Sequence, residues 1–139
     1  MFKIGVVGYT SGQFDKVLVR NELNELISML ERYYAGGQDV AVVSGLSNVG
    51  VPALAYEVAK NKDLITVGIA CARASEYEAF PVNIKIIEGT EWGDESARFV
   101  SYIDALICFG DGEQSLQEVD MFREQNPLAP LFKVELKRT

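Results

Sequence analysis

The 139-residue chain is long enough for one domain with a buried core, and 48% hydrophobic and 24% charged residues are typical of a folded protein. It contains no apolar run of the roughly 20 residues that a membrane span requires, and its first residues form a strand pattern instead of a signal peptide. The net charge of −7 argues against nucleic acid as a partner, and the absence of histidine excludes Ser-His-Asp catalysis, Cys-His catalysis and ordinary zinc sites. We therefore expect a cytoplasmic protein with no membrane partner, no metal and no cofactor.

Strand-like and helix-like segments alternate along the chain. Short apolar runs predict strands over residues 3–9, 39–44, 63–70, 82–87, 105–109 and 131–136. Apolar residues at helical spacing, such as Leu23, Ile27 and Leu30, predict helices over residues 15–34, 51–61, 90–102 and 115–125. Thr90 or Asp94 is the expected N-cap of the third helix, residues 73–80 form a polar excursion, and the last charged residues are expected to fray.

The predicted strands are apolar throughout instead of alternating, which is typical of a sheet covered on both faces. Alternation with helices indicates right-handed βαβ units and parallel strands. We therefore predict an α/β protein with a three-layer Rossmann-like fold. A single domain over residues 1–139 would hold a mostly parallel sheet of about six strands, with helices on both faces. Cys71 and Cys108 lie in or at the end of strand patterns and are interpreted as reduced structural thiols.

Three loops that follow predicted strands are rich in glycine and in hydroxyl or amide side chains: residues 8–13, 44–50 and 110–115. In a parallel sheet these loops share one edge, where ligands bind. The loop at residues 110–115 is the most informative, because it joins a buried strand to a helix whose first N–H groups can hold an anion. Three such loops at one edge predict a binding site there.

Two of these loops resemble a known family. Residues 43–51 (Val-Ser-Gly-Leu-Ser-Asn-Val-Gly-Val) resemble the GG-x-x-G-[LV]-M turn of the LOG-like Rossmann proteins. Residues 104–118 are similar to their D-a-x-I-x-x-PGG-x-GT-x-x-E segment, and the order of elements agrees along nearly the whole chain. The group includes cytokinin-type nucleotide phosphoribohydrolases and molybdenum-cofactor carrier proteins, and the first turn also resembles its DprA-like branch.

The resemblance assigns roles to individual positions. Gly112 and Ser115 match a glycine and a threonine that help hold a nucleotide phosphate, and Glu118 matches a glutamate that attends the ribose and the N-glycosidic bond in the hydrolases. Gly45 and Gly50 match the phosphate-side glycines of the earlier turn. With the residues of the neighbouring loops, the candidate ligand-binding set is Gly8, Tyr9, Thr10, Gly45, Leu46, Ser47, Gly50, Arg73, Gly110, Asp111, Gly112, Gln114 and Ser115. The candidate catalytic residues are Glu118 and Arg98, and Tyr77, Phe80 and Trp92 are candidates for stacking on a base.

The chain also departs from the family pattern. Gly110 replaces a proline, Asp111 and Gln114 replace glycines, and Glu95 occupies the position of an arginine of the hydrolases. At 4 Å from a phosphate, the charge of Asp111 would cost about 4 kcal/mol at an effective dielectric constant of 20, more than the roughly 1.5–3 kcal/mol of one charged hydrogen bond. Asp111 therefore turns away, binds hydroxyls or a base edge, or meets phosphate through a metal ion; otherwise the ligand is not a phosphate.

These observations favour a small-molecule binding protein of the LOG-like group, with a nucleotide or a related phosphorylated molecule as ligand and catalysis not established. The alternative is a phosphoribohydrolase that cleaves the N-glycosidic bond of a nucleoside 5′-monophosphate. A DprA-like single-stranded DNA binder is a further alternative that the acidic charge disfavours. The resemblance also implies a homodimer or a higher homo-oligomer.

Overall fold

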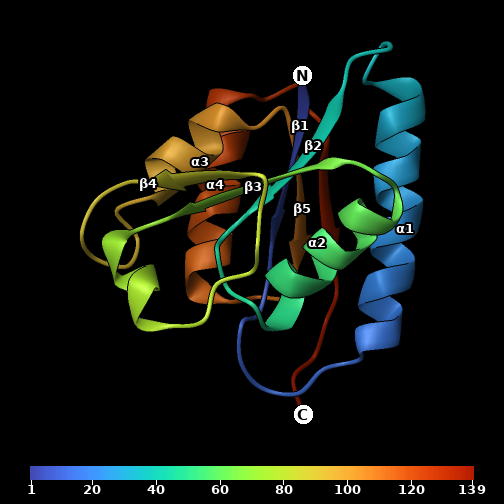
Figure 1. Cartoon of the computed structure of the whole chain (residues 1–139). Helices are drawn as coiled ribbons and strands as arrows, with labels where there is room; N and C mark the ends of the chain where they lie inside the picture. The colour runs from blue at the N-terminus through green and yellow to red at the C-terminus, as the bar shows by residue number, and fades with distance from the viewer.

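Six strands and four α-helices alternate along the chain in the computed structural model, which describes all residues 1–139 (Figure 1). The strands are β1 (Phe2–Val7), β2 (Val40–Ser44), β3 (Ile65–Ala70), β4 (Ile84–Ile87), β5 (Ala105–Phe109) and β6 (Leu131–Val134). The helices are α1 (Lys16–Tyr33), α2 (Gly50–Asn61), α3 (Ser96–Tyr102) and α4 (Glu113–Gln125), and a 3-10 turn, η1 (Ala72–Glu76), follows β3. The predicted α/β alternation is confirmed.

The strands form one sheet in the order β4-β3-β2-β1-β5-β6, and every neighbouring pair is parallel. From β1 the chain builds the sheet in one direction through β2, β3 and β4, and it then returns to place β5 and β6 on the other side of β1. All carboxyl ends therefore lie at one edge, and β1 and β5 flank the point where the strand order reverses. In open α/β sheets a crevice for ligands forms at this point.

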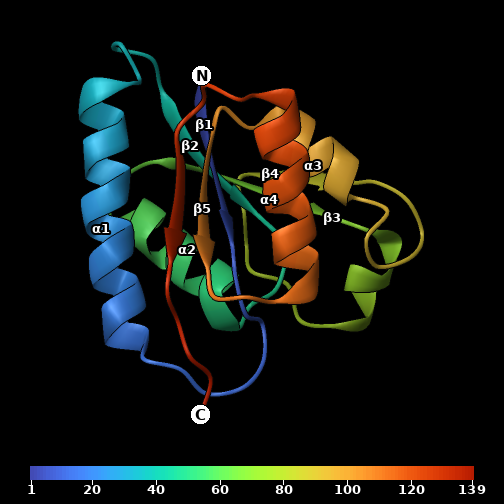
Figure 2. The ribbon, with the colours of Figure 1, turned by 180° about the vertical axis from the view of Figure 1, so that it is seen from behind.

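Helices cover both faces of the sheet, as the sequence predicts. α1 and α2 lie on one face, and α3 and α4 lie on the other (Figures 1 and 2). Successive residues of the inner strands alternate between two hydrophobic clusters, so that Ile107 packs toward α1 and α2 whereas Leu106 and Cys108 pack toward α3 and α4. Burial on both faces explains why these strands are apolar throughout.

The third helix is shorter than predicted, because residues 90–94 form a turn instead of its first part. The carboxylate of Asp94 accepts the N–H groups of Thr90 and Glu91, at 3.0 and 2.9 Å. Both donors precede Asp94 in the chain, so this side chain closes the turn and does not cap the helix. Neither Asp94 nor Thr90 is the N-cap, and α3 begins at Ser96.

The last residues, which the sequence predicts to fray, make contacts with the rest of the protein. Leu136 is buried against the cluster beneath α1 and α2, and the N–H of Thr139 donates to the carbonyl of Gln13 at 2.8 Å. These contacts hold the segment after β6 against the loop between β1 and α1. None of the helices combines the length and the apolar character that crossing a bilayer requires.

Candidate functional site

A cavity of about 790 Å³ opens at the carboxyl edge of the sheet. Its lining includes Gly8, Tyr9 and Thr10 after β1, Gly45, Leu46 and Ser47 after β2, and Gly112, Gln114, Ser115 and Glu118 from the start of α4. The three loops that the sequence selects therefore share one cavity, beside the reversal of strand order. Further lining comes from Tyr77, Glu78, Trp92 and Glu95 and from Arg138 in the segment after β6.

The N-terminus of α4 opens into this cavity without a cap. Gly112 precedes the helix and offers no side chain, and the N–H groups of Glu113, Gln114 and Ser115 have no acceptor within the protein. Ser115 is only 8% exposed, and its hydroxyl has no hydrogen-bond partner. Every polar side-chain atom that is fully enclosed in the protein has a hydrogen-bond partner. Since the Ser115 hydroxyl has none, it is not fully enclosed and opens to the cavity. Free N–H groups at the positive end of a helix and a free hydroxyl are suited to an anion.

Asp111 is held by Tyr9 and does not line the cavity. The hydroxyl of Tyr9 donates to the Asp111 carboxylate, and the N–H of Asp111 donates to the same hydroxyl oxygen at 3.1 Å. Gly110 makes this contact possible, because its φ is +83° and a Cβ there would lie 2.5 Å from the ring of Tyr9. In the structure the Asp111 carboxylate is therefore bound to a tyrosine, and the residue is not part of the cavity lining.

Glu118 lies 6% exposed in the second turn of α4 and lines the cavity. The hydroxyl of Ser96, on α3, donates to its carboxylate at 2.9 Å, and the side-chain amide of Gln114 lies 3.5 Å from that hydroxyl. Burial raises the pKa of Glu118 to about 7, and the charge of Glu95 acts in the same direction. The hydrogen bonds of Ser96 and Gln114 oppose this rise. At neutral pH this carboxyl group is therefore present in both protonation states.

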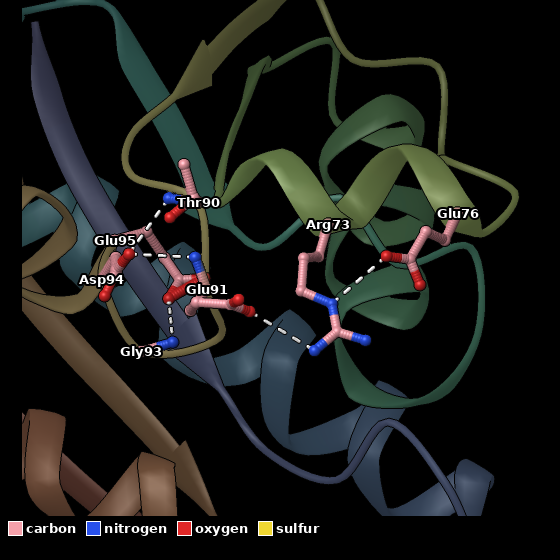
Figure 3. A network of polar contacts seen from close by, with 7 residues as sticks. All are labelled: Arg73, Glu76, Thr90, Glu91, Gly93, Asp94 and Glu95. Atoms are coloured by element: carbon pink, nitrogen blue, oxygen red, sulfur yellow. Dashed lines mark hydrogen bonds and ion pairs between the residues drawn. The ribbon is translucent and has the colours of Figure 1, made fainter.

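Glu95 is a second buried carboxylate of the cavity wall, also 6% exposed. It accepts the N–H of Gly93 at 2.7 Å, as Figure 3 shows, and the N–H of Cys71 at 3.3 Å. Glu95 therefore fastens the loop before α3 to the end of β3. The resemblance stated from the sequence matches this position to an arginine of the hydrolases, and the chain has a buried glutamate there.

Two candidate arginines lie outside the lining. Arg73 on η1 forms ion pairs with Glu76 at 3.2 Å and with Glu91 at 3.4 Å, and Figure 3 shows its guanidinium between the two carboxylates. Arg98 is an exposed residue of α3 and does not reach the cavity. Neither arginine lines the cavity, and the pattern alone could not show this.

Gly50 and Gly110 are also absent from the lining, and each has a packing role. At Gly50, φ is +72° and a Cβ would lie 2.3 Å from the carbonyl oxygen of Tyr9. The same carbonyl accepts the N–H of Val51, in the first turn of α2, at 2.8 Å. The N–H of Val51 at the start of α2 is therefore bonded within the protein, whereas the first three N–H groups of α4 are not.

Of the three candidate stacking residues, two lie on the cavity wall. Tyr77 and Trp92 have ring centroids 6.0 Å apart, and both are exposed. Phe80 instead packs on the ring of Tyr56, at 5.1 Å between centroids. Both cysteines are free and buried, and no three Asp, Glu, Cys or His side chains are grouped so as to hold a metal ion. Burial raises the pKa of Cys108 to about 11.

The fold and the cavity define a Rossmann-like α/β protein with a ligand-sized cavity at its strand ends. Solved structures share this fold over most of the chain. The molybdenum cofactor binding protein of Rippkaea orientalis has a TM-score of 0.75 and 23% identity, covering 96% of this chain and 76% of its own. A molybdenum cofactor carrier protein of Chlamydomonas reinhardtii has a TM-score of 0.69 and 21% identity, covering 96% and 75%.

A third similar structure is TM1055, a structural genomics target, with a TM-score of 0.72 and 19% identity over 94% of this chain and 72% of its own. No protein-family model matches the chain, and no curated protein matches it in sequence. At such identities the likeness establishes the fold, which is that of the molybdenum cofactor carrier proteins. The resemblance stated from the sequence is confirmed at this level.

Proposed function

We propose that the protein binds a phosphorylated small molecule of the nucleotide type in the cavity, with the phosphate at the start of α4. The Ser115 hydroxyl carries the proposal, because it is buried, has no partner and is open to the cavity beside three free N–H groups. Tyr77 and Trp92 offer aromatic surface to a heterocycle on the same wall. Two fold neighbours described as binding or carrying the molybdenum cofactor support a small-molecule ligand.

Binding is favoured over catalysis because of Glu95. In the hydrolases of the family a cation occupies this position, and here a buried carboxylate lies near Glu118 instead. A second negative charge does not assist a phosphate to bind in the orientation that N-glycosidic cleavage needs. We therefore expect a ligand to be retained and not cleaved.

The proposal is tested by calorimetric titration of the protein with nucleoside 5′-monophosphates and with the same nucleosides without phosphate. We expect the monophosphates to bind at least about tenfold more tightly, because a phosphate gains charged hydrogen bonds at the helix start. Ser115→Ala should weaken their binding, whereas Ser101→Ala on α3, outside the cavity, should leave it unchanged. Native mass spectrometry of the purified protein would show a retained ligand. Equal affinity for nucleoside and monophosphate would contradict the proposal.

Hydrolysis remains the second candidate, because one observation favours it. Burial places the pKa of Glu118 near 7, which suits a general acid or base. Incubation with the same monophosphates and chromatography for the free base separates the two functions. Our proposal expects no release of base; release that disappears in Glu118→Gln would establish the hydrolase.

A further inference from the structure

Arg138 is the one Lys or Arg side chain that lines the cavity. The other charged residues of the lining are four glutamates: Glu78, Glu95, Glu113 and Glu118. An anionic ligand in this cavity therefore meets repulsion on most sides, and one cation is available to offset it. Where that cation lies decides which part of the cavity can hold a phosphate.

The guanidinium of Arg138 lies over the ring of Tyr9, 4.3 Å from the centroid, and it forms no ion pair with any carboxylate of the protein. Its aliphatic part packs against Gly12, where a Cβ would lie 2.8 Å from Cδ of the arginine. Stacking on the ring leaves the N–H groups at the rim of the guanidinium free to donate. They are available to a bidentate acceptor such as a phosphate.

The backbone on both sides of Arg138 is fixed. Leu136 is buried, and its carbonyl lies 3.4 Å from the hydroxyl of Tyr9; the N–H of Thr139 is bonded to the carbonyl of Gln13. The side chain therefore starts from a defined position over the loop after β1. Part of the ordering that an exposed arginine needs on binding an anion is already present.

Tyr9 also places Arg138 near the start of α4. One side of the ring approaches Gly112, where an added Cβ would lie 3.8 Å from ring atoms, and the guanidinium stacks on the ring. Arg138 and the residues with free N–H groups, Glu113, Gln114 and Ser115, therefore border the same cavity, next to the ring of Tyr9. An anion between them would be contacted from both.

We infer that Arg138 binds the phosphate of the ligand and holds it against the N-terminus of α4. This inference rests on the proposed function and adds the side chain that selects for an anionic group. The two arginines that the sequence pattern suggested do not fill this role, because Arg73 is paired with two carboxylates and Arg98 lies outside the cavity. The ligand class that fits is a monoester or diester of phosphoric acid with a free face for a bidentate donor.

The test is titration of the ¹⁵N-labelled full chain with inorganic phosphate, followed by NMR at the Arg138 Nε–H and at the amides of Gln114 and Ser115. In the wild type we expect all three signals to move with one dissociation constant. Arg138→Gln should weaken the binding of phosphate about tenfold, since a charged hydrogen-bonding partner is lost. The affinity of Arg138→Lys for phosphate should lie between those of the wild type and Arg138→Gln, because lysine keeps the charge and lacks the planar guanidinium. Arg123→Gln, an exposed site in the last turn of α4, is the matched control and should bind as the wild type does.

Two results would overturn the inference, and they are distinguishable. If phosphate shifts the α4 amide signals equally in the wild type and in Arg138→Gln, Arg138 does not bind phosphate, and the proposed function is unaffected. If neither phosphate nor nucleoside monophosphates shift any of these signals in the wild type, both the inference about Arg138 and the proposed function are overturned. Thermal unfolding of each variant shows whether the segment at Leu136–Thr139 is still attached, and Arg138→Lys keeps the packing on Tyr9 if Arg138→Gln does not.

Discussion

Tyr9 contacts three separate parts of the chain at the cavity. Its hydroxyl binds Asp111, its ring carries Arg138, and its carbonyl accepts the N–H of Val51 at the start of α2. The sequence suggests Tyr9 only as a ligand contact, and the structure adds this organising role. Residue by residue, the cavity therefore depends on close approaches around one aromatic side chain, and glycines make these approaches possible.

Gly50→Ala should be strongly destabilising. Alanine at φ +72° is strained, and its Cβ would meet the carbonyl oxygen of Tyr9 at 2.3 Å. We expect a loss of about 3 kcal/mol or more in the free energy of unfolding, measured by urea denaturation. Gly36→Ala is the matched control, with φ +61° and no atom within 4 Å of the added Cβ, and it should cost only about 1 kcal/mol. Equal losses in the two variants would show that strain alone decides.

Glu118 should make stability depend on pH. The folded-state pKa of about 7 lies above the ordinary value of 4.5, so between these values the folded protein keeps a proton that the unfolded chain releases. Stability should therefore fall as pH rises through this window, by up to about 3 kcal/mol at 1.36 kcal/mol per pH unit. Glu118→Gln should remove this part of the slope and be more stable than the wild type at pH 8. Urea unfolding at pH 5 and pH 8 measures it, with the exposed Glu113→Gln as control; a slope unchanged in Glu118→Gln would contradict the assignment.

The N-termini of α1 and α4 differ in their capping. In α1 the carboxylate of Asp15 accepts the N–H of Leu18 at 3.1 Å, which closes the helix start in the ordinary way. In α4 the corresponding place is taken by Gly112, and the first N–H groups are free. A helix start that lacks a cap within a cavity wall is one whose donors are left for a ligand.

Asp15→Ala should cost about 1 kcal/mol of unfolding free energy, because the N–H of Leu18 loses its acceptor. Chemical denaturation followed by circular dichroism measures the loss. Lys16→Ala, at the next position and also exposed, should change stability by less than about 0.5 kcal/mol. If both variants lose the same amount, the cap is not the cause.

The whole molecule is held together by one sheet that is shared by two hydrophobic clusters. Neither cluster is complete without the inner strands, because successive residues of β2 and β5 point into opposite clusters. We therefore expect the protein to unfold in one transition. A destabilising substitution on the α1 face should lower the stability of the α3 face as well.

Leu23→Ala tests this coupling. Leu23 is a fully buried residue of α1, and its truncation to alanine should lower the free energy of unfolding by about 2–5 kcal/mol. Far-ultraviolet circular dichroism and the fluorescence of Trp92, which lies in the loop before α3, should give the same lowered midpoint of unfolding. Leu128→Ala, at a side chain that is 98% exposed, should leave both midpoints unchanged. Two separate midpoints in Leu23→Ala would mean that the faces unfold independently.

The alternation of elements, the covered parallel sheet and the three loops that share the cavity follow from the amino-acid pattern alone, because periodicity and glycine-rich turns are local properties. It also predicted Ser115 and Glu118, since a motif fixes their positions relative to a strand. Three further features are visible only in the folded molecule: α3 starts at Ser96, Asp111 is bound to Tyr9, and Arg138 instead of Arg73 or Arg98 borders the cavity. The start of α3 depends on the way the Asp94 carboxylate turns back to the N–H groups of Thr90 and Glu91, which helical spacing of apolar residues does not show. The contacts of Asp111 and Arg138 with Tyr9 join residues that are far apart in the sequence, and they arise from packing and charge in space, which no local pattern records.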